Sequence, residues 1–160
     1  MGLADVLPRI NGRGPGLVPE APDVAVLEDD EELATLAVEM CAKAGLSAAR
    51  YSRAGEFLGA VSTRPPKLVV LDWRLERELG AAAFMAVRHR LGGLPIVCWT
   101  STPAHELPAM LAGDALVRIV SKSAGVDAFE AAVRWAAARS AAAQPHIGHA
   151  IGQPYGGHDQ

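Results

Sequence analysis

Apolar residues follow two different rhythms along this chain. Short, largely apolar runs of four or five residues are typical of strands buried in a sheet. They predict strands at residues 24–27, 68–71, 96–99 and 116–120, and residues 47–52 are a weaker strand candidate. Between them, apolar residues recur every three or four positions, which predicts amphipathic helices. Five strands alternating with five helices predict an α/β fold, a three-layer, doubly wound sandwich around a parallel sheet.

Each predicted helix has an apolar stripe, apart from the fourth, which is expected over residues 104–112 and interrupted by Pro108. The stripes are Leu33, Leu36, Ala37, Met40 and Ala44; Ala54, Phe57, Leu58 and Val61; Phe84, Val87 and Leu91; and Val126, Phe129, Val133, Ala136 and Ala137. Asp30 is a suitable N-cap for the first helix, and Gly45 is suited to end it. Trp135 falls off the last stripe, which indicates either an exposed interface residue or a side chain covered by a tail.

The two ends of the chain depart from this pattern. Residues 1–22 and 143–160 are rich in Gly and Pro, and we expect both segments to be disordered. The folded domain is therefore expected at residues 23–142.

Composition narrows the class of protein. Lys and Arg number 15 against 18 Asp and Glu, without a basic cluster, so nucleic-acid binding is not expected. No apolar run reaches the length of roughly 18 residues needed to span a membrane. Cys41 and Cys98 both lie in apolar runs and are expected to be buried thiols of a reduced compartment. We therefore expect a cytoplasmic protein.

Polar residues that could bind a ligand or react follow the predicted strands at their carboxyl ends, where ligands bind in parallel α/β sheets. They are Glu28, Asp29, Asp72, Thr100, Ser101 and Lys122. Carboxylates from different strands suit Mg²⁺, which prefers oxygen ligands. A carboxylate beside that ion is a candidate nucleophile toward phosphorus, and an ammonium and a hydroxyl would stabilise the phosphoryl oxygens. The pattern therefore favours phosphoryl transfer to Asp72.

These segments resemble the four signatures of bacterial two-component response-regulator receiver domains. The segments are Val-Leu-Glu-Asp-Asp at 26–30, Leu-Val-Val-Leu-Asp at 68–72, Pro-Ile-Val-Cys-Trp-Thr at 95–100 and Val-Ser-Lys at 120–122. Gly80, eight residues after Asp72, matches the loop glycine of the family. The resemblance covers about residues 23–140. It implies a flavodoxin-like sheet in the order 2-1-3-4-5.

The resemblance also implies a function. Asp72 would accept a phosphoryl group from a histidine kinase or a histidine phosphotransfer protein, in a stand-alone, chemotaxis-regulator-like module that signals to an unidentified output protein. Such a module is not an enzyme beyond its self-catalysed phosphotransfer and dephosphorylation, and a homodimer is a further possibility. The implied site comprises Mg²⁺ ligands at Asp29, Asp72 and the backbone carbonyl of Arg74, with Glu28 acting through water, and phosphoryl-binding or switch residues at Thr100, Ser101 and Lys122.

The chain departs from the family pattern in three places. Ser123 stands where a proline normally follows Lys122, and Ile119 stands where the switch normally has Tyr or Phe. The loop after Asp72 lacks its usual proline. We expect Ile119 to stay packed in both states, so the switch would not run through an aromatic rotamer.

Three alternatives remain. A degenerate receiver would bind partners without phosphate, as Ile119 and Ser123 allow. A small aspartyl-phosphate phosphatase of the haloacid-dehalogenase type would need Asp two residues after the nucleophile, where this chain has Arg74. A flavodoxin-like FMN protein would need a hydroxyl-rich loop where Glu28 and Asp29 would repel phosphate.

Overall fold

The computed structural model describes residues 20–75 and 80–143. In this part of the chain, five parallel strands form one sheet in the order β2-β1-β3-β4-β5. The strands are β1 (Val24–Leu27), β2 (Ala48–Tyr51), β3 (Leu68–Leu71), β4 (Ile96–Thr100) and β5 (Val117–Ser121). The flavodoxin-like fold and its strand order are therefore confirmed. The segments predicted to be disordered, residues 1–22 and 143–160, lie almost wholly outside the described residues.

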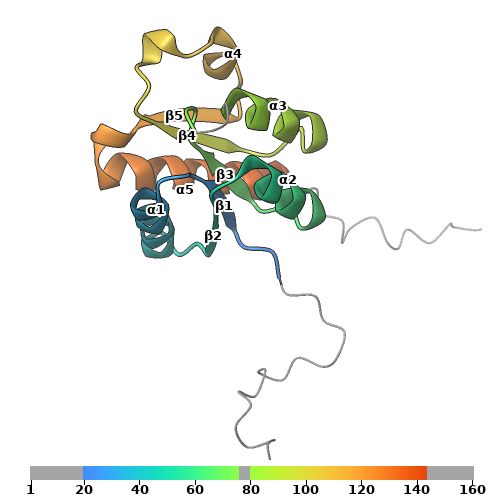
Figure 1. Ribbon diagram of the computed structural model, residues 1–160. Coiled ribbons are helices and arrows are strands. Elements are labelled where there is room, and N and C mark those ends of the chain that lie inside the picture. Colours follow the sequence, from blue (N-terminus) through green and yellow to red (C-terminus); the bar gives the residue numbers. More distant parts are fainter. Residues whose placement is uncertain (1–19, 76–79, 144–160) are drawn as a thin grey trace, which may run out of the picture.

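Helices cover both faces of the sheet (Figure 1). They are α1 (Glu31–Lys43), α2 (Ala54–Thr63), α3 (Gly80–Arg90), α4 (Ala109–Ala112) and α5 (Val126–Ala143), with 3-10 turns η2 (Ala104–Glu106) and η3 (Lys122–Ala124). Helices α1 and α5 share a core with Val26 and Val70, whereas α2, α3 and α4 share a second core with Leu27 and Leu71. Since successive strand residues point to opposite faces, strands covered on both sides are apolar throughout.

The buried face of α1 is rotated by about one position from the predicted stripe. Ala37 and Met40 are buried as expected, but Leu36 is 39% exposed, and Ala34 and Cys41 are buried instead. The predicted and the observed buried faces share Ala37 and Met40. The prediction wrongly placed Leu36, the larger side chain, on the buried face. Small residues on the sheet side let the helix lie close to the strands, and tertiary packing selected them.

Pro108 divides the predicted fourth helix, as expected. The segment forms η2, a short extended link, and then the four-residue α4, with Pro108 at the N-cap position of α4. Proline fits there because the first residues of a helix need no intrahelical N–H donor.

Trp135 is partly covered rather than fully exposed. Trp135 is in α5, and its ring packs against the core that α1 and α5 share. In the described part of the chain, two guanidinium groups flank the ring. The guanidinium carbons of Arg118 and Arg139 lie 4.6 Å and 4.3 Å from the ring centroid. Arg118 comes from β5 and Arg139 from the next turn of α5, so these contacts add cation–π attraction to the packing.

Cys41 and Cys98 are free and buried, as predicted. Burial raises the pKa of each thiol to about 12, so both are protonated at neutral pH. No helix in the described ranges is long and apolar enough to cross a bilayer.

A forked ion pair connects the end of α3 to the loop before β5. Arg88 Nε and Nη2 donate to Asp114 Oδ2 and Oδ1 at 2.6 Å and 3.1 Å, and both side chains are mostly buried. Arg88 also donates to the carbonyl of Leu94, and Asp114 Oδ1 accepts from the backbone N–H of Leu116. Burial alone would raise the pKa of Asp114, but these donors outweigh it and hold that pKa below the ordinary value of 3.8.

We therefore expect Asp114→Asn to lower the free energy of unfolding by about 1–3 kcal/mol at pH 7, because it weakens a charged, partly buried hydrogen-bonded pair. The folded-state pKa is depressed, so the stabilisation is complete above about pH 3.8 and is lost as the pH falls below that value. Urea unfolding of both proteins at several pH values measures this. The exposed Asp127→Asn is the control and is expected to cost less than about 1 kcal/mol; equal losses in the two variants would contradict the prediction.

Candidate functional site

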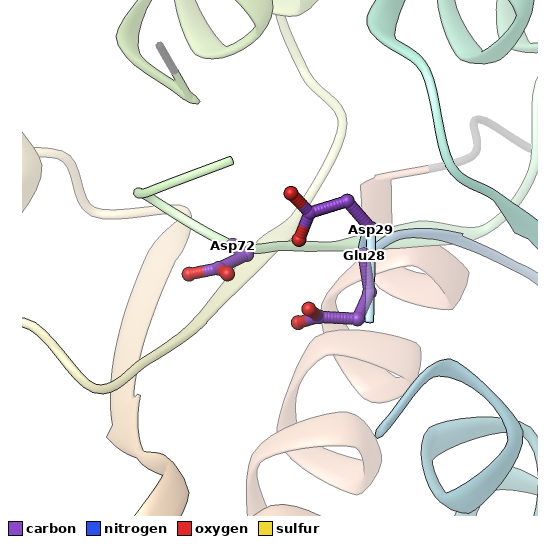
Figure 2. A group of neighbouring side chains, drawn as sticks. All are labelled: Glu28, Asp29 and Asp72. Carbon is purple, nitrogen blue, oxygen red and sulfur yellow. The ribbon is translucent and has the colours of Figure 1, made fainter. Parts of the chain in front are cut away.

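The polar residues singled out from the sequence converge at the carboxyl edge of the sheet. Strands β1 and β3 are in register at Leu27 and Leu71, so Glu28 and Asp72 leave adjacent strands at the same level. Asp29 lies beside them, and suitable carboxylate oxygens of these three residues all lie within 4.8 Å of one another (Figure 2). Glu28 and Asp72 are 2% and 5% exposed. Close, hard oxygen donors from two strands fit the ligand preference of Mg²⁺.

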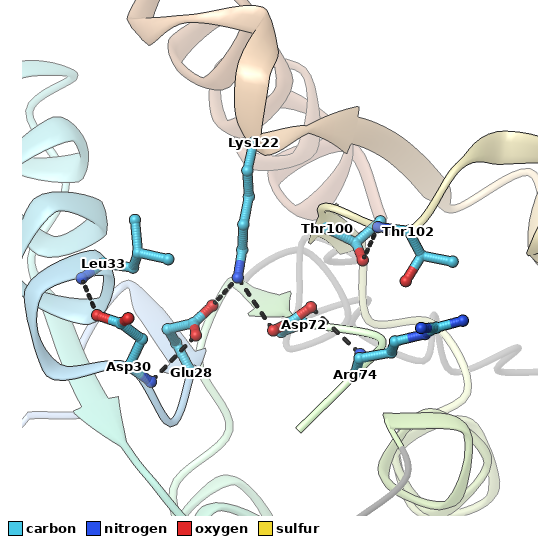
Figure 3. Close-up of polar contacts among 8 residues, drawn as sticks. All are labelled: Glu28, Asp30, Leu33, Asp72, Arg74, Thr100, Thr102 and Lys122. Atoms are coloured by element: carbon cyan, nitrogen blue, oxygen red, sulfur yellow. Dashed lines mark hydrogen bonds and ion pairs between the residues drawn. The ribbon is translucent and has the colours of Figure 1, made fainter. Parts of the chain in front are cut away.

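Lys122, at the start of η3, reaches both buried carboxylates (Figure 3). Its Nζ lies 2.6 Å from Glu28 Oε2 and 3.0 Å from Asp72 Oδ2. The second oxygen of each carboxylate accepts a backbone N–H two residues on: Asp30 N donates to Glu28 at 3.1 Å, and Arg74 N donates to Asp72 at 3.2 Å. Both carboxylates are therefore held in fixed orientations.

The site carries more negative than positive charge, with three carboxylates against one ammonium. Burial and the charge of Asp72 raise the pKa of Glu28, and Lys122 only partly offsets them. Burial would lower the pKa of Lys122, but the two carboxylates outweigh it and raise that pKa. Both shifts are those expected of an anionic pocket, and a bound divalent cation would neutralise the excess charge.

A hollow of about 230 Å³ opens beside Asp72 and is lined by Asp72, Arg74, Thr100, Ser101, Thr102 and Pro103. Thr100 is buried, and its Oγ1 accepts the N–H of Thr102 at 3.1 Å. Ser101 lines the same hollow but is exposed. The predicted hydroxyl residues Thr100 and Ser101 therefore line the same cavity as Asp72.

Thr102 is a site residue that the sequence analysis missed. Its Oγ1 is buried and has no hydrogen-bond partner in the described part of the chain. A buried hydroxyl without a partner is costly, unless a ligand or water satisfies it. The only sequence signal is the run of three hydroxyl residues that ends at Thr102.

Two of the three family departures, Ile119 and Ser123, have different structural consequences. Ile119 lies in β5 opposite Cys98 and packs, half-buried, against the core on the α2–α3–α4 side. Ser123 donates its backbone N–H to Ser121 Oγ at 3.2 Å, a bond that a proline could not make. Ser121 therefore caps η3, which carries Lys122 at its start.

Trp73 and Trp99 pack near the site. Trp73 contacts Phe84 edge-on, with ring centroids 6.3 Å apart, and Trp99 contacts Phe129 in the same way at 5.2 Å. Lys122 Nζ lies 5.3 Å from the centroid of Trp99, so this ring supports the lysine side chain from β4.

Matches to known proteins agree with this geometry. The family model of the response regulator receiver domain matches residues 24–134, well over half of the chain. The chain therefore belongs to the response regulator receiver domain family, whose members are signalling domains. Receiver domains generally bind Mg²⁺ at an acidic pocket, and this chain has an acidic cluster of Glu28, Asp29 and Asp72.

Solved structures share the fold. NtrX from Brucella abortus, solved in complex with ATP, is 23% identical with a TM-score of 0.66, and the match covers 76% of this chain but only 28% of NtrX. The receiver domain of Francisella response regulator 1452 is 17% identical with a TM-score of 0.64, over 74% of this chain and 98% of that domain. A sensor protein from Polaromonas sp. JS666 is 24% identical with a TM-score of 0.65, over 74% and 98% of the two chains. No curated protein sequence matched.

Gly80 is required by a close approach to the backbone of the site. A Cβ at this position would lie 2.3 Å from the carbonyl oxygen of Asp72 and 2.6 Å from that of Trp73. We expect Gly80→Ala to lower the free energy of unfolding by about 1–3 kcal/mol, because the backbone after β3 must shift.

The matched control is Gly59→Ala in α2, where a new Cβ would meet nothing within 4 Å. Alanine is the better helix former, so this control is expected to gain roughly 0.5–1 kcal/mol. Urea unfolding of both variants distinguishes the two positions; a Gly80→Ala protein as stable as the control would mean that the close approach does not exist in solution.

Proposed function

We propose that this receiver domain accepts a phosphoryl group on Asp72, with Mg²⁺, from a phosphohistidine of a histidine kinase or a histidine phosphotransfer protein. The observation that carries the proposal is the position of Asp72. Its carboxylate is buried at the carboxyl edge, contacts Lys122 Nζ at 3.0 Å, and opens onto the hollow lined by Thr100. An acceptor, a cation and a hydroxyl are thus present on three neighbouring strand ends.

The transfer follows from these groups. A carboxylate oxygen of Asp72 forms a bond to phosphorus as the phosphorus–nitrogen bond of the donor histidine breaks, and the departing imidazole takes up a proton. Lys122 and the hydroxyl of Thr100 then stabilise the phosphoryl oxygens. Glu28, Asp29, Asp72 and the carbonyl of Arg74 would hold Mg²⁺, with Glu28 acting through water. When bound, the ion supplies positive charge that offsets the repulsion between the carboxylates and the incoming phosphoryl group.

The degenerate-receiver alternative is less well supported. Ile119 and Ser123 depart from the family pattern, but neither disturbs the contacts that Lys122 makes with Asp72 and Glu28. For a phosphatase, the residue two positions after Asp72 would have to act as an acid. Arg74 has a guanidinium in place of a carboxyl group there, and it pairs with Glu106.

We infer that the output of this domain is protein binding. The segment from residue 102 to 113 contains only short elements, η2 and α4, so a small free-energy bias is enough to reorder it. Partners would read this segment and α5. Trp135 is a weaker candidate contact than its position off the stripe indicated, because Arg118 and Arg139 flank its ring.

The phosphoacceptor is tested by intact mass after incubation with acetyl phosphate and Mg²⁺. Wild type and the exposed control Asp127→Asn are expected to gain one phosphoryl group that hydroxylamine removes, and Asp72→Asn to gain none. Lys122→Met should slow the reaction by a factor of order 10², because one electrostatic group near the transferred phosphoryl is lost. A hydroxylamine-labile phosphoryl group on Asp72→Asn would refute the assignment.

Metal binding is tested separately by tryptophan fluorescence, since Trp73 directly follows Asp72. We expect Mg²⁺ to change the emission of wild type at concentrations up to ~10 mM, and Asp29→Asn to weaken binding roughly tenfold or more through loss of a carboxylate ligand. Glu39→Gln, an equal charge change on the exposed side of α1, is expected to titrate like wild type. If Mg²⁺ did not change the tryptophan emission, or if wild type, Asp29→Asn and Glu39→Gln titrated equally, the result would count against the metal site.

A further inference from the structure

Arg74 connects the proposed phosphoacceptor to the segment after β4. Its backbone N–H donates to Asp72 Oδ1 at 3.2 Å, while its guanidinium Nη2 donates to Glu106 Oε2 at 3.1 Å. Glu106 is the last residue of η2. One residue therefore bonds with its backbone to Asp72 and with its side chain to η2 (Figure 3 shows the former bond).

Arg74 also lines the cavity in which a phosphoryl group on Asp72 would sit. Of the described residues that line the 230 Å³ hollow, Arg74 is the one with a cationic side chain. The orphaned hydroxyl of Thr102 is on the same wall and would gain a partner from an anion there. Lys122, a second cation at the site, is already shared between Glu28 and Asp72.

The ion pair with Glu106 is suited to exchange. Its two side chains are 71% and 44% exposed, and pairs so exposed to water are weak. Phosphorylation turns the singly charged carboxylate of Asp72 into a group with about two negative charges and additional oxygen acceptors. A guanidinium binds such a group through two parallel hydrogen bonds, more strongly than it binds an exposed carboxylate.

We propose that Arg74 is a second phosphoryl-binding cation, and that its guanidinium moves from Glu106 to the phosphoryl group on Asp72, which releases η2. The proposal rests on phosphorylation of Asp72, as inferred above. η2 is three residues long, all of them exposed, and backbone bonds from Glu106 to Pro103 and from Leu107 to Ala104 hold its turn. Loss of the Arg74 contact therefore removes a tie between η2 and the loop after β3. Phosphorylation of Asp72 would in this way change the output segment, residues 102–113, without an aromatic residue at position 119.

The test uses fluoroberyllate with Mg²⁺, which binds a carboxylate as a phosphoryl analogue, in the full chain. Tryptophan fluorescence gives its affinity for wild type, Arg74→Gln, Glu106→Gln and the double variant. Arg74→Gln is expected to weaken binding about tenfold. Glu106→Gln should strengthen it about threefold, because the competing partner of Arg74 is gone.

The double variant separates exchange from a general charge effect. If Glu106 acts by holding Arg74, then Glu106→Gln has no effect in the Arg74→Gln background. If it acts only as a nearby negative charge, the threefold gain persists there, and the proposal is overturned. Lys67→Gln is the control for Arg74, since Lys67 is an exposed, ion-paired cation at the opposite end of β3. Glu39→Gln is the control for Glu106, and both controls should bind like wild type.

Hydrogen exchange gives a second readout. Fluoroberyllate should speed exchange of the amides of residues 104–107 in wild type, whereas in Glu106→Gln they should exchange fast before it is added. Wild-type affinity in Arg74→Gln, or unchanged exchange of these amides, overturns the proposal while leaving phosphorylation of Asp72 intact. Failure of wild type to bind fluoroberyllate, together with no phosphoryl mass from acetyl phosphate, overturns both.

Discussion

The ion pairs of Lys122 with Glu28 and Asp72 are the interaction on which the carboxyl edge of this domain depends. Two nearly buried carboxylates stand side by side at the ends of adjacent strands and repel each other. The ammonium, at 2.6 Å and 3.0 Å from them, is what makes that arrangement tolerable. Removing one partner from a buried pair of this kind typically costs about 3–5 kcal/mol. The remaining negative charge leaves the site ready for a divalent cation.

The strand order explains why a long cation is needed there. Lys122 follows β5, whereas Glu28 and Asp72 follow β1 and β3, and β4 lies between. The side chain therefore has to cross the end of β4, where Trp99 lies beneath the ammonium and is in turn packed on Phe129 of α5. An aromatic residue that is chemically inert thus has a positioning role for the charged group of the site.

The departures from the family pattern leave this arrangement intact and concentrate in the segments that would transmit a signal. Ser123 stands where the family has a proline, and its backbone N–H bonds to Ser121 Oγ at the start of η3. Ile119 has an aliphatic side chain without a hydroxyl where the family has Tyr or Phe. Beside these departures, Pro108 leaves only the short elements η2 and α4 between β4 and β5. These features fit the two proposals, that Asp72 accepts the phosphoryl group and that the response involves Arg74 and η2.

Much of this protein could be predicted from local sequence. The apolar runs located β1, β3 and β4 because a strand covered on both faces must be apolar throughout. The position of Asp72 directly after such a run placed it at the carboxyl edge, and the resemblance to receiver domains added the strand order. The same reasoning located Glu28 and Lys122, since ligand-binding residues of parallel sheets follow strand ends.

Other features were decided only by tertiary structure. Overlapping apolar stripes on α1 left its rotation open, and contact with the sheet chose Ala34 and Cys41 over Leu36. The pairing of Arg74 with Glu106 and the unpartnered hydroxyl of Thr102 depend on how two loops far apart in sequence approach each other. Periodicity reports which face of an element is apolar, but it carries no information about which polar side chains meet across loops. Those contacts arise only once the sheet has set the distances between strand ends.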